Sequence, residues 1–95
     1  MKIKTKHFSG DVSVGFGQYQ DNLRPTIMIM DLNGRTTMIA SVNLPDEPCE
    51  PGHTYIKDWS ENEGILQSLL DAGIIRDTGK SARTGFVSAR YVQIL

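Results

Sequence analysis

The segment from residue 25 to residue 44 contains the feature that most constrains the fold, a pair of apolar runs separated by Asn33-Gly34. The first run, PTIMIMDL, has the length of a strand, and the second, RTTMIASVNL, places alternate apolar residues on one face. An Asn-Gly pair between two such runs is typical of a β-hairpin, because a type I′ turn needs positive φ at both central residues. The sequence therefore predicts an antiparallel hairpin with Asn33 and Gly34 as its turn residues.

Two further segments have the pattern of strands. In DVSVGFGQYQ, residues 11–20, Val12, Val14 and Phe16 alternate with small or polar residues. Tyr19 breaks this alternation, and the glycines on either side of Phe16 predict a β-bulge or a strong local twist. The carboxy-terminal segment FVSARYVQIL is rich in β-branched and aromatic residues and predicts a terminal strand.

The stretch WSENEGILQSLLDAG has three features of a helix. Ser60 and Glu63 have the spacing of a capping box, the isoleucine and leucines form an apolar stripe, and Gly73 is placed to end the helix. Gly64 would stand in the first helical turn, where glycine lowers helix propensity by about 1 kcal/mol relative to alanine. We therefore expect a side chain to pack closely against Gly64, with the Trp59 ring as the nearest candidate.

Together these patterns predict one α+β domain over residues 1–95, with a small antiparallel sheet of four to five strands and one helix packed on one face. Residues 1–10 can be flexible. The segment PDEPCEPGH, residues 45–53, contains three prolines and predicts a surface crossing, because proline lacks the amide donor that a strand ladder needs.

The composition narrows the class of partner. The net charge is -1 and the isoelectric point is about 6.0, so the chain has no overall attraction to nucleic acid or to an anionic membrane. A single cysteine, Cys49, cannot form an internal disulfide, so a reducing cytoplasm is the expected setting. No apolar run follows the amino-terminal lysines or approaches the length of a membrane-spanning helix, so we expect no signal peptide and no membrane partner.

The segment DTGKSARTG, residues 77–85, is the part of the chain that most resembles a chemical site. A phosphate-binding P-loop reads G-x-x-x-x-G-K-[ST], but Gly73 and Gly79 enclose five residues, and a helix precedes the segment where the motif needs a strand. We interpret the segment as a loop in which Gly79 and Gly85 supply unusual backbone angles and hydroxyl groups bond to the backbone. A second interpretation stays open, a small cationic patch for phosphate or for an acidic partner surface. Its residues are Arg76, Lys80, Arg83 and Arg90.

Other reactive residues are few. Cys49 and His53 lie four positions apart, but one cysteine and one histidine do not supply the four ligands of a structural zinc site. Glu61 and Glu63 point in different directions on a helix, so they do not form a catalytic carboxylate pair. Asn62 has no predicted structural role, and Glu61 and Asn62 are candidate surface contacts. The sequence predicts no catalytic residue, no metal site and no cofactor.

The first strand of the hairpin is apolar on both sides. Met28, Met30 and Leu32 share one face. Ile27 and Ile29 lie on the other face, so the strand must be buried on both sides or covered on one side by a partner. With one helix available to cover one face, a homodimer or another partner is our hypothesis for the second.

The carboxy-terminal half of the chain resembles a known family. The stretches IKDWSENEGILQSLLDAGIIRDTGK and RTGFVSARYVQIL are similar to the pattern I-K-D-[YW]-S-E-N-E-G, a leucine-bearing helix, A-G-I, T-G and G-[FY]-V. This pattern resembles that of short uncharacterised proteins carried by phages, plasmids and conjugative elements, and the likeness covers about residues 42–95. The resemblance implies no activity, cofactor or site. It implies a mobile-element setting, in which small accessory proteins bind host components, including defence systems.

The sequence therefore favours a non-enzymatic binding protein of a phage or mobile element that acts by protein contact on a host defence or regulatory factor. The alternative is a protein that sequesters a nucleotide or nucleic acid through the cationic region from Arg76 to Arg90. Salt dependence would distinguish the two, because phosphate binding weakens steeply as salt rises.

Overall fold

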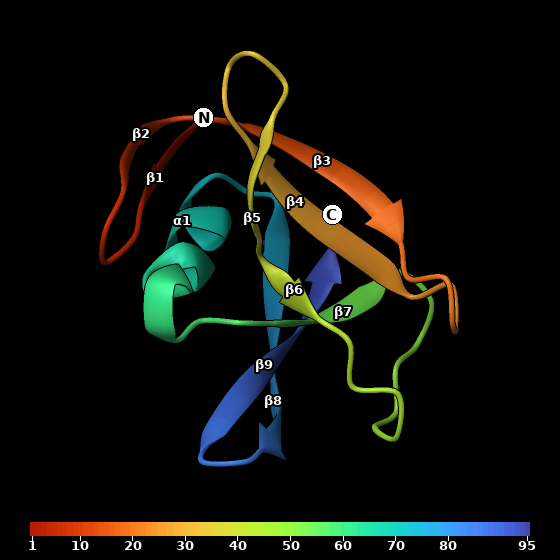
Figure 1. Ribbon diagram of the computed structural model, residues 1–95. Coiled ribbons are helices and arrows are strands. Elements are labelled where there is room, and N and C mark those ends of the chain that lie inside the picture. Colours follow the sequence, from red (N-terminus) through yellow and green to blue (C-terminus); the bar gives the residue numbers. More distant parts are fainter.

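The computed structural model describes residues 1–95 and contains nine strands, one 3₁₀ helix and one α-helix (Figure 1). The strands are β1 (Lys2–Lys4), β2 (Ser9–Asp11), β3 (Ser13–Gln18), β4 (Pro25–Met30), β5 (Thr36–Ile39), β6 (Ser41–Val42), β7 (His53–Ile56), β8 (Ile75–Thr84) and β9 (Val87–Ile94). The helices are η1 (Ser60–Asn62) and α1 (Ile65–Asp71). The strands pair in three antiparallel sheets, β1-β2, β3-β4-β5 and β6-β7-β9-β8. The α+β class is confirmed, whereas the predicted single sheet of four to five strands is wrong.

β4 and β5 form the predicted hairpin, but the turn between them is of another type. The N–H of Gly34 donates to the carbonyl of Asp31 at 3.0 Å, and the N–H of Asp31 donates to the carbonyl of Arg35 at 2.8 Å. Within this loop only Gly34 has a positive φ, 84°, which fits a type I turn followed by a left-handed glycine. The Asp31 carboxylate also accepts the N–H of Asn33 at 2.9 Å. The loop therefore has three residues, 32–34, one more than predicted. The backbone and the carboxylate of Asp31 stabilise it by bonding to the loop backbone.

β3 extends this sheet without the predicted bulge, because its pairing with β4 keeps one register throughout. Gly15 and Gly17 instead make room for side chains of β4. A Cβ at Gly15 would lie 2.7 Å from Cε of Met30, and a Cβ at Gly17 would lie 2.8 Å from the hydroxyl oxygen of Thr26. Crowding across the strand pair thus accounts for both glycines.

A bend at Ala40 explains why there are two larger sheets instead of one. The N–H of Ala40 donates to the carbonyl of Ile27 at 2.8 Å, and the N–H of Lys57 donates to the carbonyl of Ala40 at 2.8 Å. One residue therefore bonds to β4 on one side and to the segment after β7 on the other. Beyond it the chain continues as β6 in the four-stranded sheet, as Figure 1 shows.

The sequence suggested that residues 1–10 could be flexible. In the structure they form β1 and the start of β2. Ile3 is buried, with 2% of its surface exposed. The N–H of Lys4 donates to the Ser68 hydroxyl at 3.0 Å, and the N–H of Lys6 donates to the carbonyl of Glu63 at 2.9 Å. The amino-terminal hairpin is thus bonded to α1 and to the residues that precede it.

Helix α1 begins without the predicted capping box. Ser60 starts η1, and the side chain that accepts bonds from the start of α1 is Asp58. Its Oδ1 atom accepts the N–H of Gly64 and the N–H of Leu66, both at 3.0 Å. Asp58 is the better placed acceptor because the 3₁₀ turn separates Ser60 and Glu63 from the first turn of α1.

Gly64 marks a close approach between distant parts of the chain. Its φ is 105°, and a Cβ there would collide with the carbonyl oxygen of Lys4. The backbone of β1, and not the Trp59 ring, therefore packs against Gly64. The helix ends at Asp71, and Gly73 follows it as the predicted terminator with a φ of 71°. The N–H of Gly73 donates to the carbonyl of Leu70 at 3.1 Å.

The main core lies between the two larger sheets and α1. Ile65 and Leu69 of α1 are fully buried, which confirms the predicted apolar stripe. The ten core residues are Ile3, Val12, Ile27, Ile29, Ala40, Ile56, Ile65, Leu69, Ile75 and Val92. A second cluster covers the opposite face of the four-stranded sheet and contains Tyr55, Ala82, Ala89 and Tyr91. α1 has seven residues, and no helix in the structure is long and apolar enough to cross a bilayer.

β4 is the strand predicted to be apolar on both faces. Ile27 and Ile29 are fully buried in the core. Met28 and Met30 are half-buried on the opposite face, where their side chains lie over the glycines of β3. Leu32 does not join them, because it lies in the turn and is 75% exposed. Figure 1 shows α1 and the four-stranded sheet on one side of β4 only, so the methionine face points outward.

Candidate binding surface

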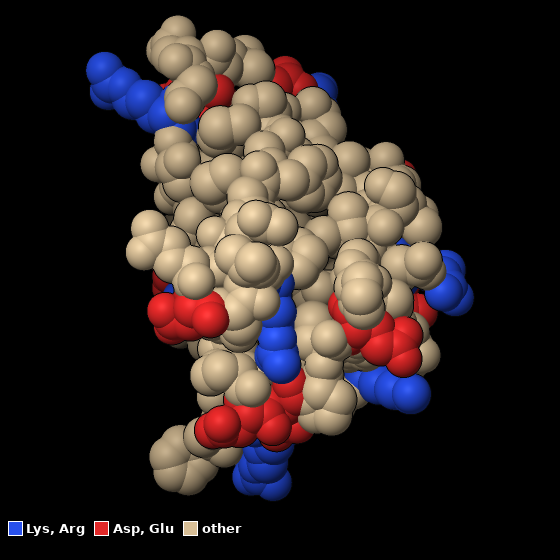
Figure 2. Space-filling view, turned by 90° about the vertical axis from the view of Figure 1, so that its right-hand side faces the viewer, with Lys and Arg blue, Asp and Glu red and all other residues tan.

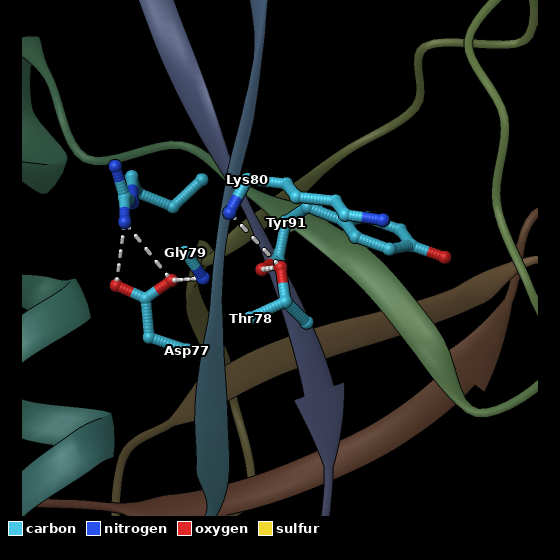
Figure 3. A network of polar contacts seen from close by, with 6 residues as sticks. Asp77, Thr78, Gly79, Lys80 and Tyr91 are labelled. Carbon is cyan, nitrogen blue, oxygen red and sulfur yellow. Dashed lines mark hydrogen bonds and ion pairs between the residues drawn. The ribbon is translucent and has the colours of Figure 1, made fainter.

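The segment DTGKSARTG forms most of strand β8, so its interpretation as a loop is wrong. The pairing of β8 with β9 shifts between Asp77 and Lys80, which makes a bulge (Figure 3). The N–H of Gly79 donates to the Asp77 carboxylate at 2.9 Å. The Thr78 hydroxyl donates to the carbonyl of Tyr91 at 2.6 Å and accepts the N–H of Lys80 at 3.2 Å. These polar side chains therefore bond to the backbone of the bulge, as predicted for the hydroxyl of Thr78.

The four predicted cationic residues are divided between two faces of the hairpin. Cross-strand partners share a face, and successive residues of a strand alternate between faces. The register therefore places Arg76 and Lys80 on the face of Tyr91. Arg83 and Arg90 lie on the other face, so the four cations do not form one patch.

Two of these cations already have partners. Nη2 of Arg90 lies 3.0 Å from Oδ2 of Asp77, and 37% and 28% of the two side chains are exposed. Nε of Arg76 donates to the side-chain carbonyl of Gln93 at 3.0 Å. The side chains of Lys80 and Arg83 are exposed and bond to no other side chain, and Nε of Arg83 donates to the carbonyl of Gly85 at 3.4 Å.

The ion pair at the bulge keeps Asp77 ionised. Burial raises the pKa of Asp77, but the bonds from the Gly79 N–H and the Arg90 guanidinium outweigh burial and hold the pKa below its ordinary value. Asp77 is therefore negatively charged at neutral pH and neutralises Arg90.

The β8–β9 hairpin ends in a two-residue turn that exposes an aromatic ring. Thr84 pairs with Val87, so Gly85 and Phe86 are the turn residues. Gly85 has a φ of 62°, as the first position of a type II′ turn requires. Phe86 is 100% exposed, and Figure 1 shows the tip projecting away from the rest of the molecule. The sequence pattern places Phe86 at the start of the terminal strand, so its position in the turn was not predicted, although Gly85 before it is a turn signal.

The proline-rich loop lies beside this tip and adds negative charge. The two share a surface hollow of about 190 Å³, lined by Leu44, Pro45, Asp46, Glu47, Arg83 and Thr84. Arg24 holds the loop in place by donating to the carbonyls of Leu44 at 2.6 Å and of Glu47 at 2.7 Å. Figure 2 shows blue and red side chains interspersed toward this lower end of the molecule, with no broad blue area on the face in view. The tip is therefore mixed in charge.

A second hollow, of about 180 Å³, lies beside Lys80 and is lined by Pro48, Glu50, Tyr55, Lys80 and Tyr91. The Tyr55 hydroxyl donates to the carbonyl of Pro48 at 2.6 Å, and the Tyr91 hydroxyl accepts the N–H of Glu50 at 2.7 Å. Figure 3 shows the Lys80 side chain running beside Tyr91. Because both phenols bond to the proline-rich loop, the tyrosines hold that loop against the sheet.

The two predicted contacts before α1 have different environments. Glu61 is at the surface, where its carboxylate accepts a bond from Nζ of Lys57 at 2.8 Å. This bond lowers the pKa of Glu61. Asn62 is 1% exposed, and its amide donates to the carbonyl of Ile39 at 2.8 Å. The expectation that Asn62 is a surface contact is therefore wrong, because its side chain closes the edge of β5.

Cys49 and His53 are close, but the thiol and the imidazole do not face each other. The thiol donates to the backbone carbonyl of His53 at 3.2 Å, and Nδ1 of His53 lies 2.9 Å from the carbonyl of Pro51. Burial raises the pKa of Cys49, and the Arg24 charge only partly offsets this. No group of three or more His, Cys, Asp or Glu residues is arranged to hold a metal ion.

Comparison of the chain with protein-family models, with curated proteins and with solved structures found no match.

Proposed function

We propose that this chain is a non-enzymatic binding protein that contacts another protein with the end of its β8–β9 hairpin and uses Phe86 as the central anchor. The single observation that carries the proposal is the complete exposure of Phe86 at the tip of a projecting hairpin. Aromatic residues are enriched among the side chains that dominate protein–protein binding energy.

The turn makes the ring an efficient anchor. A two-residue turn between paired strands fixes the backbone of Phe86 before any partner arrives, so little backbone entropy is lost on binding. Full burial of a phenylalanine side chain contributes about 2 kcal/mol. The partner should therefore offer an apolar pocket, with a carboxylate at its rim that can pair with Arg83.

The setting of the proposal comes from the resemblance of residues 42–95 to proteins of phages, plasmids and conjugative elements. Small accessory proteins of such elements act on host components, so we propose a host protein as the partner, in the host cytoplasm. A defence or regulatory factor is the class of host protein that this analogy favours.

The charges of the hairpin favour a protein over a phosphate ligand. A phosphate backbone is bound by a continuous row of cations. Here Arg76 and Arg90 have partners within the chain, the four cations lie on two faces, and Asp46 and Glu47 line the hollow beside the tip.

A photocrosslinking experiment tests the proposal. A photoreactive phenylalanine analogue at position 86 should form a covalent adduct with a discrete host protein, whereas the same analogue at the exposed position Leu32 should not. Phe86→Asn should weaken binding of that protein by about 30-fold, the equivalent of about 2 kcal/mol, and Leu32→Asn should leave binding unchanged.

Salt titration of the same complex distinguishes protein contact from phosphate binding. Binding through an apolar anchor should fall only modestly as salt rises. If binding instead collapses with salt and survives Phe86→Asn, the hairpin binds phosphate through Lys80 and Arg83 and the proposal is wrong.

A further inference from the structure

Strand β3 has an outer edge with no partner in the chain. It is the terminal strand of its sheet, beside β4. The N–H of Tyr19 donates to the carbonyl of Arg24 at 2.9 Å. Because backbone groups alternate along an antiparallel strand, the N–H and C=O groups of residues 13, 15 and 17 also point toward β4. The N–H and C=O groups of Val14, Phe16 and Gln18 therefore point away from the sheet.

This edge has none of the devices that normally prevent strand pairing. Natural sheets protect their edges with charged residues, prolines, bulges, very short strands or a covering segment. β3 is six residues long, SVGFGQ, with no charge and no proline, and its register is regular. Two other edges are protected in this way: β8 has a bulge and four charged residues, and Asn62 bonds to the carbonyl of Ile39 at the end of β5.

The centre of the same edge exposes an aromatic ring. Phe16 is 53% exposed although it lies on the core-facing side of β3, opposite the fully buried Ile27. The chain thus leaves a large apolar side chain uncovered at the point where the free backbone groups are centred.

We propose that a second copy of this chain pairs with β3, antiparallel and about a two-fold axis at Phe16, so that the sheets of the two copies join into one. Val14 of each copy then lies opposite Gln18 of the other, and every outward N–H and C=O of residues 14, 16 and 18 has a partner.

The symmetry of this arrangement is the reason for choosing a second copy as the partner. The two Phe16 rings become direct cross-strand neighbours, and aromatic pairs in that position stabilise a sheet. No charged residue of β3 faces its own copy, so no repulsion opposes the pairing. The outward methionine faces of the two β4 strands then lie in one continuous sheet.

The inference does not depend on the proposed function, because β3 and the β8–β9 tip belong to different sheets. The test can therefore fail or succeed without reference to a host protein.

Sedimentation velocity over a series of protein concentrations is the first measurement. The natural chain should form a reversible dimer, and Phe16→Lys should raise the dimer dissociation constant by at least about tenfold, because it removes the aromatic pair and places like charges opposite each other. Phe86→Lys makes the same chemical change at a fully exposed site on the other hairpin and should leave the dimer unchanged. Circular dichroism should show that both variants remain folded.

Amide hydrogen exchange identifies the surface. The amides of Val14, Phe16 and Gln18 should become more slowly exchanging as protein concentration rises. Gln18→Pro removes an outward N–H that β4 does not use, so it should abolish the dimer and preserve the monomer. A monomer at every concentration up to that of the NMR sample overturns the proposal, as does a dimer that persists in Phe16→Lys and Gln18→Pro or leaves these amides unprotected.

Discussion

Strands β3 and β8 both end a sheet, but they present opposite chemistry to the solvent. β8 carries Arg76, Asp77, Lys80 and Arg83 and a bulge held by its own side chains, whereas β3 is regular and uncharged. Charges and a bulge keep a strand edge solvated and unpaired, and their absence leaves an edge ready to pair. The cationic residues of β8 look like a binding site in the sequence, but this contrast gives them a second role, which is to protect the β8 edge from strand pairing.

The edge of β5 offers the largest test of this comparison, because a buried side chain closes it. Asn62→Ala removes the amide that bonds to the carbonyl of Ile39 and leaves a cavity. An unsatisfied buried acceptor and the lost packing should together cost about 2–3 kcal/mol of unfolding free energy, with a fall in melting temperature of about 10–20 °C. Thermal unfolding followed by circular dichroism measures this.

Glu61→Ala is the matched control, since Glu61 is adjacent in the chain but exposed and should change stability little. If Asn62→Ala also changes stability little, the bond to Ile39 does not protect the β5 edge. β5 could then no longer be contrasted with β3 as a protected edge.

The bulge of β8 should respond less strongly. Asp77→Asn weakens the bonds to the Gly79 N–H and to Arg90, and because about a third of each charged side chain is exposed we expect a loss of about 0.5–1 kcal/mol at neutral pH. Urea unfolding measures this loss. Asp21→Asn, at an exposed carboxylate in the β3–β4 turn, should have no comparable effect.

The loss should depend on pH in a defined direction. The folded-state pKa of Asp77 is depressed, so its contribution is present above the ordinary carboxyl pKa of about 4 and disappears as pH falls through the lower folded value. The natural chain and Asp77→Asn should therefore approach equal stability in acid. A difference that stays constant down to low pH would show that ionisation of Asp77 does not stabilise the bulge.

The smallest effect concerns the turns of the two hairpins. The β8–β9 turn has glycine at positive φ, whereas the β3–β4 turn places Leu23 at a φ of 61° with 64% of its surface exposed. Leu23→Gly should relieve about 1–2 kcal/mol of backbone strain and lose part of it to the greater freedom of glycine in the unfolded chain, for a net gain of about 0.5 kcal/mol. Chemical denaturation would measure this gain. If the variant is less stable, the buried part of the Leu23 side chain stabilises the fold by more than the backbone strain costs.

The sequence predicted the local elements well where one short pattern decided them. The hairpin of β4 and β5, the apolar stripe of α1 and the terminal strand β9 are all present. Errors arose where a side chain outside the recognised pattern decided the outcome. The Asp31 carboxylate bonds to the backbone of the turn, Asp58 accepts the bonds at the helix start in place of Ser60, and Gly15 makes room for Met30 instead of forming a bulge.

The stretch SENEG shows the same limit at the candidate site. In the sequence it looked like a cap followed by surface contacts. In the structure Asn62 reaches β5, the carbonyl of Glu63 accepts a bond from Lys6, and Gly64 lies against the carbonyl of Lys4. Each partner lies more than twenty residues away in the chain, so no pattern within the stretch could reveal its role as a junction.

The α+β class, the position of the helix and the proline-rich crossing follow from the local sequence, because periodicity, glycine and proline act through nearest neighbours. Long-range contacts, in contrast, divide the strands between two sheets at Ala40, place the cations of β8 on two faces, and leave Phe16 and Phe86 exposed. These outcomes depend on which strands pair and in what register. Pairing is set by contacts between residues far apart in the chain, and a sequence read locally does not contain them.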